Sequence, residues 1–525
     1  MNIKKGFSLF LVICLMLVTV GCGGKTGQAI TCALSQEPVT LDPQIANDAA
    51  ARTVITALYE GLVRLDENNQ PTPGVAERWE SNADATSFTF YLRKTTKWSN
   101  GDPVTAHDFQ YAIARALDPQ TGSTTYTPLL AIQNAAAVVQ GAEASQLGVT
   151  VLDDYTLRFD LAYSCDAFPA MTALPVFMPC NHTFFTQSAG KYGLDANYIL
   201  GNGPFRMTNR YSWEHNQYIN LSAASTYSGH SPVLPSTLTF SIGTVDVSDT
   251  KSRSVFALSS AADLANAQAA GYTISASQEI TWGLCLNTQN TVLQSTAVRR
   301  AFLQTLNRES LLQYIPAGCT TADDIITPDM TFLGKNYRSF AGEDYYLRQD
   351  ATAVSAALSA LSAQGLSKLP SLSVLCPDDP SIKKMVNEML ASWNTAFGTY
   401  FNMEPLSQAE LENRVQTGDY AIALYAVRPT NADPGSLLSQ FSSTSRTNPA
   451  NFHTTEYDAL LQSAQQQSHA AAVAQYAKAE QLLNEQGVFY PIYYQKRYYA
   501  VSSALTGIVL HPYDMGLDFR SAAKA

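Results

Sequence analysis

The most restrictive feature of this sequence is a strand–helix–strand pattern between residues 371 and 404. Apolar residues fall at i, i+3, i+4, i+7, i+8 and i+11, the spacing of one helical face: Ile382, Met385, Val386, Met389, Leu390 and Trp393. Strands are predicted on either side, at 371–376 and 399–404. A strand, a helix and a second strand in this order form a parallel pair with a right-handed crossover. The pattern therefore predicts an α/β fold.

The length of the chain points to more than one lobe. A single hydrophobic core seldom serves 525 residues, so two or three lobes are expected. A composition of 46% hydrophobic and 15% charged residues is typical of a globular protein. After the N-terminal segment, no apolar run reaches the roughly 20 residues that a membrane-spanning helix needs.

The N-terminal segment has the organisation of a secretory signal. Lys4 and Lys5 precede an apolar stretch over residues 7–20, and Gly21 and Cys22 follow. The segment is similar to a bacterial lipoprotein signal, which implies that Cys22 is the lipidated first residue, although Thr19 stands where lipoproteins usually carry leucine. The alternative is an uncleaved membrane anchor. Either reading places the folded part outside the cytoplasm.

Charge and cysteine usage exclude some classes of partner and site. Loss of the signal takes away two lysines and no acid, which changes the formal net charge from −11 to −13 and disfavours nucleic acid as a partner. Cys180 and His182 are the only close Cys/His pair, so no metal or other cofactor is expected. A disulfide between Cys165 and Cys180 and free buried thiols are equally compatible with the sequence.

Residues 75–109 predict a strand, a turn and a helix. Alternating and aromatic residues at 86–93 indicate the strand, and residues 97–101 the turn. Thr105 is suited to cap the helix, with Asp108 three residues later in a variant of the capping box. Further along, residues 150–161 predict a hairpin around Asp153-Asp154, and residues 49–62 predict a helix.

This stretch also carries a resemblance. The strings AERW at 76–79, FTFYLR at 88–93 and KWSNGDPVTAHDF at 97–109 resemble the signature of the oligopeptide- and dipeptide-binding solute receptors of ABC importers, family 5 of the extracellular solute-binding proteins. The phrases LDP at 41–43, YEGL at 59–62 and LGNGPFRM at 200–207 are similar to the same family. An ordinary strand–turn–helix would explain the periodicity but not this order of unusual residues.

The resemblance implies a fold and its division into lobes. The fold is periplasmic-binding-protein-like, class II or cluster C: a two-lobed Venus flytrap with an extra third domain. We expect lobe I to comprise residues 23–66, 192–279 and 496–525, lobe II, the extra lobe, residues 67–191, and lobe III, the second ligand-binding lobe, residues 280–495. Gly201 and Gly203 indicate positive φ or a close backbone approach at the return to lobe I, or else a plain tight turn before a strand.

The resemblance also implies a ligand-binding set: Tyr59, Glu60, Tyr126, Trp282, Asn287, Tyr425, Arg428 and Asp433. Ordinary core packing or a structural ion pair is the alternative for each. Alignment of the DPGS phrase at 433–436 with the family puts Thr430 where an aspartate would hold the ligand's ammonium group. Either Asp433 or Glu60 replaces that aspartate, or the ligand has no free amino terminus. Arg428, in a segment predicted to be a loop, is suited to a carboxylate.

The sequence lacks the local motifs of common hydrolases and nucleotide-binding enzymes, and its seven histidines are scattered. We therefore expect no catalysis, but an extracytoplasmic lipoprotein receptor, monomeric and held to the membrane only by its lipid. It would deliver peptides to the permease subunits of an ABC importer. The alternatives are another solute in the same fold (an opine, an oligosaccharide or a nickel chelate), an extracellular hydrolase, and a chaperone or adhesion lipoprotein.

Overall fold

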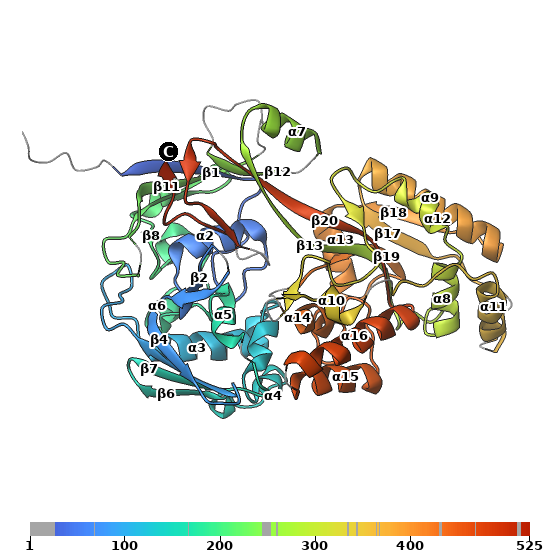
Figure 1. Cartoon of the computed structure of the whole chain (residues 1–525), viewed down its shortest axis with the longest axis horizontal. Coiled ribbons are helices and arrows are strands. Elements are labelled where there is room, and N and C mark those ends of the chain that lie inside the picture. The colour runs from blue at the N-terminus through green and yellow to red at the C-terminus, as the bar shows by residue number, and fades with distance from the viewer. Residues whose placement is uncertain are drawn as a thin grey trace, which may run out of the picture.

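The structure is a computed structural model that describes residues 27–67, 69–165, 167–230, 232–243, 254–258, 261–332, 335–342, 345–363, 365–366, 368–429, 433–467, 469–511 and 516–525. The predicted signal peptide, Cys22 and Thr430 lie outside these residues. One large mixed sheet extends through both halves of the molecule (Figure 1), in the strand order β18-β17-β19-β13-β20-β12-β1-β11-β10-β8. This α/β architecture confirms the predicted fold class.

Lobe I contains one end of the large sheet. Its strands are β1 (Gln28–Leu34), β8 (Phe205–Arg206), β9 (Trp213–Glu214), β10 (Tyr218–Ala223), β11 (Pro235–Ile242) and β12 (Val255–Leu258). Strand β1 pairs in parallel with both β11 and β12. Helix α7 (Ala261–Ala269) packs on β12, and the C-terminal strands β21 (Leu505–Thr506), β22 (Val509–His511), β23 (Gly516–Asp518) and β24 (Ala523–Lys524) return here, with β23 against α2 (Ala49–Leu58).

Helix α2 is shorter than predicted. The expected range was 49–62, but the helix ends at Leu58 because Tyr59 adopts extended backbone angles. The Leu58 carbonyl accepts a hydrogen bond from the Gly203 amide, N to O 2.8 Å, and a side chain at either Gly201 or Gly203 would strike Leu58 backbone atoms. Close backbone approach is therefore the reason for both glycines. Tertiary contact ends the helix one turn early.

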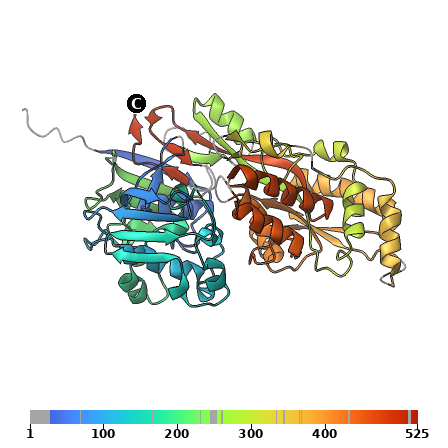
Figure 2. The same cartoon turned by 60° about the horizontal axis from the view of Figure 1, so that its bottom comes forward.

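Lobe II is a four-stranded antiparallel sheet with helices on one side (Figure 2). The strand order is β4 (Ala76–Ser81), β5 (Ser87–Leu92), β7 (Thr156–Asp160), β6 (Val149–Asp153). Strand β5, the β6–β7 hairpin and α3 (Ala106–Leu117) confirm the predicted elements. The Asp108 carboxylate accepts hydrogen bonds from the amide and hydroxyl of Thr105, at 2.7 and 3.1 Å, and the bond from the amide is the one that a capping box requires of Asp108.

The remaining elements of lobe II and of its junction with lobe I are short. They are β2 (Val63–Leu65), β3 (Pro71–Pro73), α4 (Ala135–Val139), α5 (Phe168–Met171) and α6 (His182–Gln187), with 3₁₀ turns at Pro119–Thr121, Thr127–Ala131, Ala144–Gln146, Pro175–Phe177, Ala196–Tyr198 and Arg210–Ser212. One continuous hydrophobic core contains residues of both lobes, from Ile30 and Leu58 to Phe90 and Phe168. Lobes I and II therefore share a core. Their predicted boundaries stay a prediction.

Lobe III has helices on both faces of its part of the sheet. Strands β17 (Ser373–Pro377) and β18 (Asn402–Leu406) flank α12 (Pro380–Phe397) and pair in parallel, which confirms the crossover. Successive residues of β17 enter different cores: Val374 and Cys376 pack in one, Leu375 in the other. The helices are α8 (Thr296–Gln304), α9 (Arg308–Leu312), α10 (Arg338–Ala341), α11 (Ala353–Ala363), α13 (Gln408–Gln416), α14 (Pro434–Leu438), α15 (Thr455–Gln465) and α16 (His469–Glu485).

The prediction of a loop from Arg428 onward is wrong in its second half. Asp433 caps α14, a helix over Pro434–Leu438, and its Oδ1 accepts a hydrogen bond of 2.7 Å from the Gly435 amide. Proline is favoured in the first turn of a helix because its missing N–H is not needed there. Five residues are too few for a periodic apolar pattern, so the sequence signal was the cap and the proline alone.

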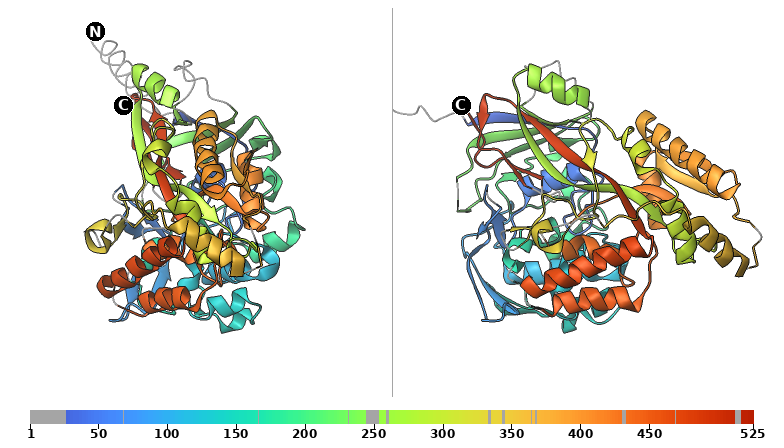
Figure 3. Two further views of the ribbon diagram at one scale, coloured as in Figure 1. Left: turned by 90° about the vertical axis from the view of Figure 1, so that its right-hand side faces the viewer. Right: turned by 45° about the vertical axis from the view of Figure 1, so that its right-hand side comes forward.

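Two long strands connect lobes I and III. Strands β13 (Thr273–Leu286) and β20 (Phe489–Val501) pair antiparallel and cross together from one lobe to the other (Figure 3, right). In lobe III, β13 also pairs with β19 (Ile422–Val427), and the short strand β14 (Thr320–Thr321) pairs with β20; β15 (Thr331–Phe332) and β16 (Lys335–Asn336) form a separate pair. The strand predicted from residue 282 is the final third of β13.

Two findings concern the state of Cys165 and Cys180 and the presence of membrane-spanning helices. Cys165 and Cys180 are both buried thiols, and the Cys165 Sγ lies 3.8 Å from the Met171 Sδ. Throughout the described ranges, the helices are all too short or too polar to cross a bilayer.

Candidate functional site

Two of the predicted ligand-binding residues lie on the central strands of lobe III. Trp282, on β13, is 9% exposed; its Nε1 donates to the Gln495 Oε1 at 2.6 Å, and its ring stacks on Tyr493 with centroids 5.9 Å apart. Tyr425 lies on the neighbouring strand, opposite Gly283. Burial raises the pKa of the Tyr425 hydroxyl, so it stays a neutral hydrogen-bonding group. Because Trp282 pairs with Ala426 and Gly283 with Tyr425, the two aromatic side chains lie on opposite faces of this part of the sheet, each packed against a different core of lobe III.

Asn287 directly follows the last residue of β13. Its Nδ2 donates to the backbone carbonyls of Gly418 and Tyr420, at 3.1 and 2.9 Å. It lines a polar hollow of about 500 Å³ together with Arg414 and Asn451. The structure therefore places Asn287 beyond the end of the strand that carries Trp282 and commits its amide to the backbone.

Arg428 and Asp433 follow β19. Arg428 is exposed, and its carbonyl accepts a hydrogen bond from the Gln440 Nε2 at 2.7 Å. The Asp433 carboxylate caps α14 and is hydrogen-bonded to the Tyr476 hydroxyl, whose pKa is raised chiefly by burial. The same carboxylate acts electrostatically on Tyr163, a residue of lobe II. Asp433 is thus an anionic group on the side of lobe III that faces lobe II.

Tyr126 lies at a contact between lobes II and III. Its side chain is buried, and its hydroxyl accepts a hydrogen bond from the Arg446 amide at 3.2 Å. The Arg446 guanidinium lies over the Tyr126 ring, 5.3 Å from its centroid, and Nη2 donates to the Val139 carbonyl. Arg446 belongs to the loop between α14 and α15, so two lobes meet at this point.

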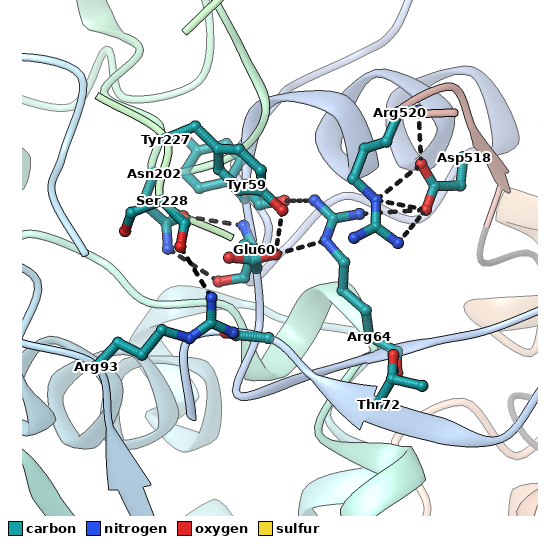
Figure 4. Close-up of polar contacts among 11 residues, drawn as sticks. Tyr59, Glu60, Arg64, Thr72, Arg93, Asn202, Tyr227, Ser228, Asp518 and Arg520 are labelled. Carbon is teal, nitrogen blue, oxygen red and sulfur yellow. Dashed lines mark hydrogen bonds and ion pairs between the residues drawn. The ribbon is translucent and has the colours of Figure 1, made fainter. Parts of the chain in front are cut away.

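Tyr59 and Glu60 belong to a separate, buried network of charges (Figure 4). Glu60 is 2% exposed; its Oε1 accepts from the Arg64 Nε and from the Tyr227 hydroxyl, both at 2.7 Å. The Asn202 side chain accepts a hydrogen bond of 3.0 Å from the Glu60 amide and donates one of 2.9 Å to the Glu60 carbonyl. The Tyr59 hydroxyl lies 3.1 Å from that of Tyr192. The Glu60 carboxylate is therefore compensated within the protein.

The network continues to the C-terminal strands. Arg64 Nη1 lies 3.6 Å from the Asp518 Oδ2, and Arg520 Nη2 lies 2.7 Å from the same oxygen. Burial would raise the pKa of Asp518, but the two arginines outweigh it and lower the pKa to about 2. Burial lowers the pKa of the neighbouring His511 to about 4. Residues more than 450 positions apart in sequence thus stabilise one junction.

Sequence reasoning missed several members of these networks. Arg64 follows Glu60 by four residues, but α2 ends at Leu58, so the helical i, i+4 rule does not apply and the ion pair depends on the tertiary fold. Arg115, on α3, binds both carboxylate oxygens of Asp42, at 2.7 and 2.6 Å, and closes one side of a cavity of about 1020 Å³ between α3, α6 and the 138–144 segment. Nothing local in the sequence indicated Arg446, Asp518 or Arg520.

Together these features describe a binding protein's architecture. Two lobes are joined by paired strands, the stacked Trp282 and Tyr493 lie on those strands, and buried ion pairs connect the N-terminal and C-terminal segments. Such a framework can hold a ligand by hydrogen bonds and stacking. The roles predicted for the eight ligand-binding residues remain predictions.

Comparisons with known proteins agree with this architecture. The profile of the family described as "Bacterial extracellular solute-binding proteins, family 5 Middle" matches residues 70–449. The chain is 24% identical to the dipeptide-binding protein DppE of Bacillus subtilis, over 97% of both chains, and 25% identical to the probable deoxycholate-binding periplasmic protein YgiS of Escherichia coli, over 90% of this chain and 89% of YgiS.

A solved structure gives the same answer. The crystal structure of the substrate-binding domain of an oligopeptide ABC transporter from Bacillus anthracis superposes with a TM-score of 0.81 at 26% identity, over 95% of this chain and 99% of that one. The two-lobed solute-binding fold is thereby confirmed. This chain belongs to the bacterial extracellular solute-binding proteins of family 5.

Proposed function

We propose that this protein is an extracytoplasmic receptor that captures peptides between lobes I and III and delivers them to the permease of an ABC importer. It acts as a lipoprotein anchored through Cys22 and has no catalytic role. The observation that carries the proposal is the match of residues 70–449 to family 5, together with relatives that align over 97% of this chain and whose names specify dipeptides and oligopeptides.

The residues near the crossover suit a peptide. Asp433 supplies a negative charge beside the hydroxyl of Tyr476, and this pair is suited to an ammonium group. Arg428 supplies a guanidinium for a carboxylate. An extended peptide bound between these groups would satisfy its backbone as an added strand does, while its side chains occupy hydrated pockets. Such a site recognises the backbone and tolerates varied sequences.

The specific alternative is a non-peptide solute in the same fold. A relative of similar identity, YgiS, is named for probable deoxycholate binding, so the family fold does not fix the ligand class. An opine, an oligosaccharide or a nickel chelate belongs to the same alternative. Thr430 stands where the resemblance to the family leads us to expect an aspartate. This departure is a further reason to test for a non-peptide ligand.

Native mass spectrometry separates the two readings. The chain is expressed from residue 23 onward, purified gently and denatured to release its ligand. A heterogeneous set of short peptides supports the proposal. A single non-peptide mass refutes the peptide assignment but keeps the receptor. Release of products from peptides or glycosides on incubation would instead indicate a hydrolase.

A further inference from the structure

The extra lobe contacts lobe III at Arg446. Tyr126 and the carbonyl of Val139 belong to lobe II, whereas Arg446 belongs to lobe III. The contact comprises a backbone hydrogen bond of 3.2 Å, a side-chain hydrogen bond and a guanidinium over an aromatic ring at 5.3 Å. In Figure 1 the end of α4 accordingly meets the segment between α14 and α15.

A second pair of residues from the two lobes lies along the same boundary between lobes II and III. Asp433, at the start of α14, acts electrostatically on Tyr163, which follows the last strand of the lobe II sheet. The lobe II partners lie on segments packed into the core that lobes I and II share. Lobe II is therefore fixed to lobe I and moves with it, so any opening of lobe III must break these contacts.

We infer that Arg446 is a latch residue: by holding Tyr126 and Val139, it stabilises the closed arrangement of the lobes and slows the release of ligand. The extra lobe thereby provides the surface against which lobe III closes. This inference rests on the proposed function for its effect on ligand release, but the latch itself is a property of the ligand-free protein. It makes Tyr126 a closing contact, in addition to any role in lining the site.

The linkage between closure and binding sets the size of the effect. A contact present only in the closed form raises the closed-to-open ratio by its own equilibrium factor. It slows ligand dissociation by a similar factor. Loss of one cation–π contact and one charge-assisted hydrogen bond at a partly exposed site corresponds to a change of about tenfold. Arg446→Ala removes both and leaves the backbone amide in place.

Arg210→Ala is the matched control. Arg210 also lies over a tyrosine ring, that of Tyr211 at 4.6 Å, and donates to its hydroxyl, but both residues belong to lobe I. The control therefore removes an exposed arginine–tyrosine contact that does not cross between lobes. Arg446→Lys keeps a cation over the ring and loses the planar fork, so it should recover part of the effect.

Single-molecule FRET between dyes at the exposed positions Asp84 in lobe II and Asn387 in lobe III reports closure without ligand. We expect Arg446→Ala to lower the closed-to-open ratio about tenfold, with Arg446→Lys between it and the wild type and Arg210→Ala unchanged. Stopped-flow release of trialanine and pentaalanine should accelerate by a similar factor in Arg446→Ala.

A closed fraction in Arg446→Ala equal to that of Arg210→Ala overturns the latch, whether or not either peptide binds. If Arg446→Ala does not fold, the ratio in Arg446→Lys decides in the same way. If neither peptide binds the wild type while Arg446→Ala still opens the ligand-free protein, the latch stands and the peptide assignment fails with these probes.

Discussion

Asp518→Asn tests the buried charge network at the junction of the N-terminal and C-terminal segments. The wild-type carboxylate is 7% exposed and lies between Arg64 and Arg520. Its pKa falls from 3.8 to about 2, which corresponds to about 2 kcal/mol of stability at 1.36 kcal/mol per pKa unit. The amide also leaves two arginines with less compensation, so we expect a total loss of about 3 kcal/mol at pH 7.

The pH dependence of this loss has a definite sign. Because folding lowers the pKa of Asp518, its carboxylate stabilises the folded protein fully above about pH 4, the value of the unfolded chain. That stabilisation decreases as the pH falls through about 2, where the folded carboxyl takes up its proton. The difference in unfolding free energy between the wild type and Asp518→Asn should therefore be greatest near neutral pH and shrink below pH 4.

Urea unfolding of the mature chain, followed by circular dichroism at several pH values, measures this difference. Asp378→Asn is the control, because Asp378 forms an ion pair of 2.7 Å with Lys383 but its side chain is 62% exposed. An exposed pair contributes about 0–1 kcal/mol. If Asp518→Asn were no more destabilising than Asp378→Asn, or if its effect did not depend on pH below 4, the argument from burial and charge would be refuted.

Three further predictions concern protonation, ligand binding and anchoring. Folding lowers the pKa of His511 from 6.5 to about 4, so the unfolding free energy should fall by about 3 kcal/mol as the pH drops across that window. His511→Gln should flatten this slope, and an unchanged slope would contradict it. Asp433→Asn keeps the cap of α14 but removes the charge; we expect about a hundredfold weaker binding of peptides with a free amino terminus and little change for N-acetylated ones. Equal losses for both would remove Asp433 from the ammonium site. Cys22→Ser should move the protein from the membrane fraction to the soluble fraction on cell fractionation, and retention in the membrane would favour an uncleaved anchor.

Periodic and capped segments of the fold could be predicted from the sequence. The apolar face of α12, the Thr105–Asp108 cap of α3 and the β6–β7 hairpin each depend on residues close in sequence, and each is present. The end of α2 was not predictable from local pattern, because the Leu58 carbonyl meets Gly203 only after the chain returns to lobe I. Local signals identify elements, but tertiary contacts set their limits.

The sequence supplied candidate members of the site, whose roles remain predictions, but it did not supply the partners of those residues in the fold. Resemblance supplied Trp282, Tyr425 and Asp433, and strand pairing places the first two on neighbouring strands. The partner of Tyr126 is Arg446, 320 positions away, and the Glu60 network extends to Asp518. No spacing rule connects residues so distant, since a network is fixed by the folded geometry and not by a repeat.

The crossover strands show how one sheet can serve two moving lobes. The pairing of β13 with β20 has register shifts between Gln278 and Ile280 and between Trp282 and Gly283, at the point where the strands leave lobe I for lobe III. A bulge adds a residue to one strand, bends it and increases its local twist. The first shift lies before Thr281, where β13 begins to pair with β19, so bending there would let lobe III rotate without breaking the hydrogen-bonded ladders within either lobe. Trp282, which stacks on Tyr493, lies two residues beyond this shift, so this aromatic pair adjoins the bend. A ligand resting on Trp282 would therefore contact the part of the sheet whose bending would carry lobe III toward or away from lobe II.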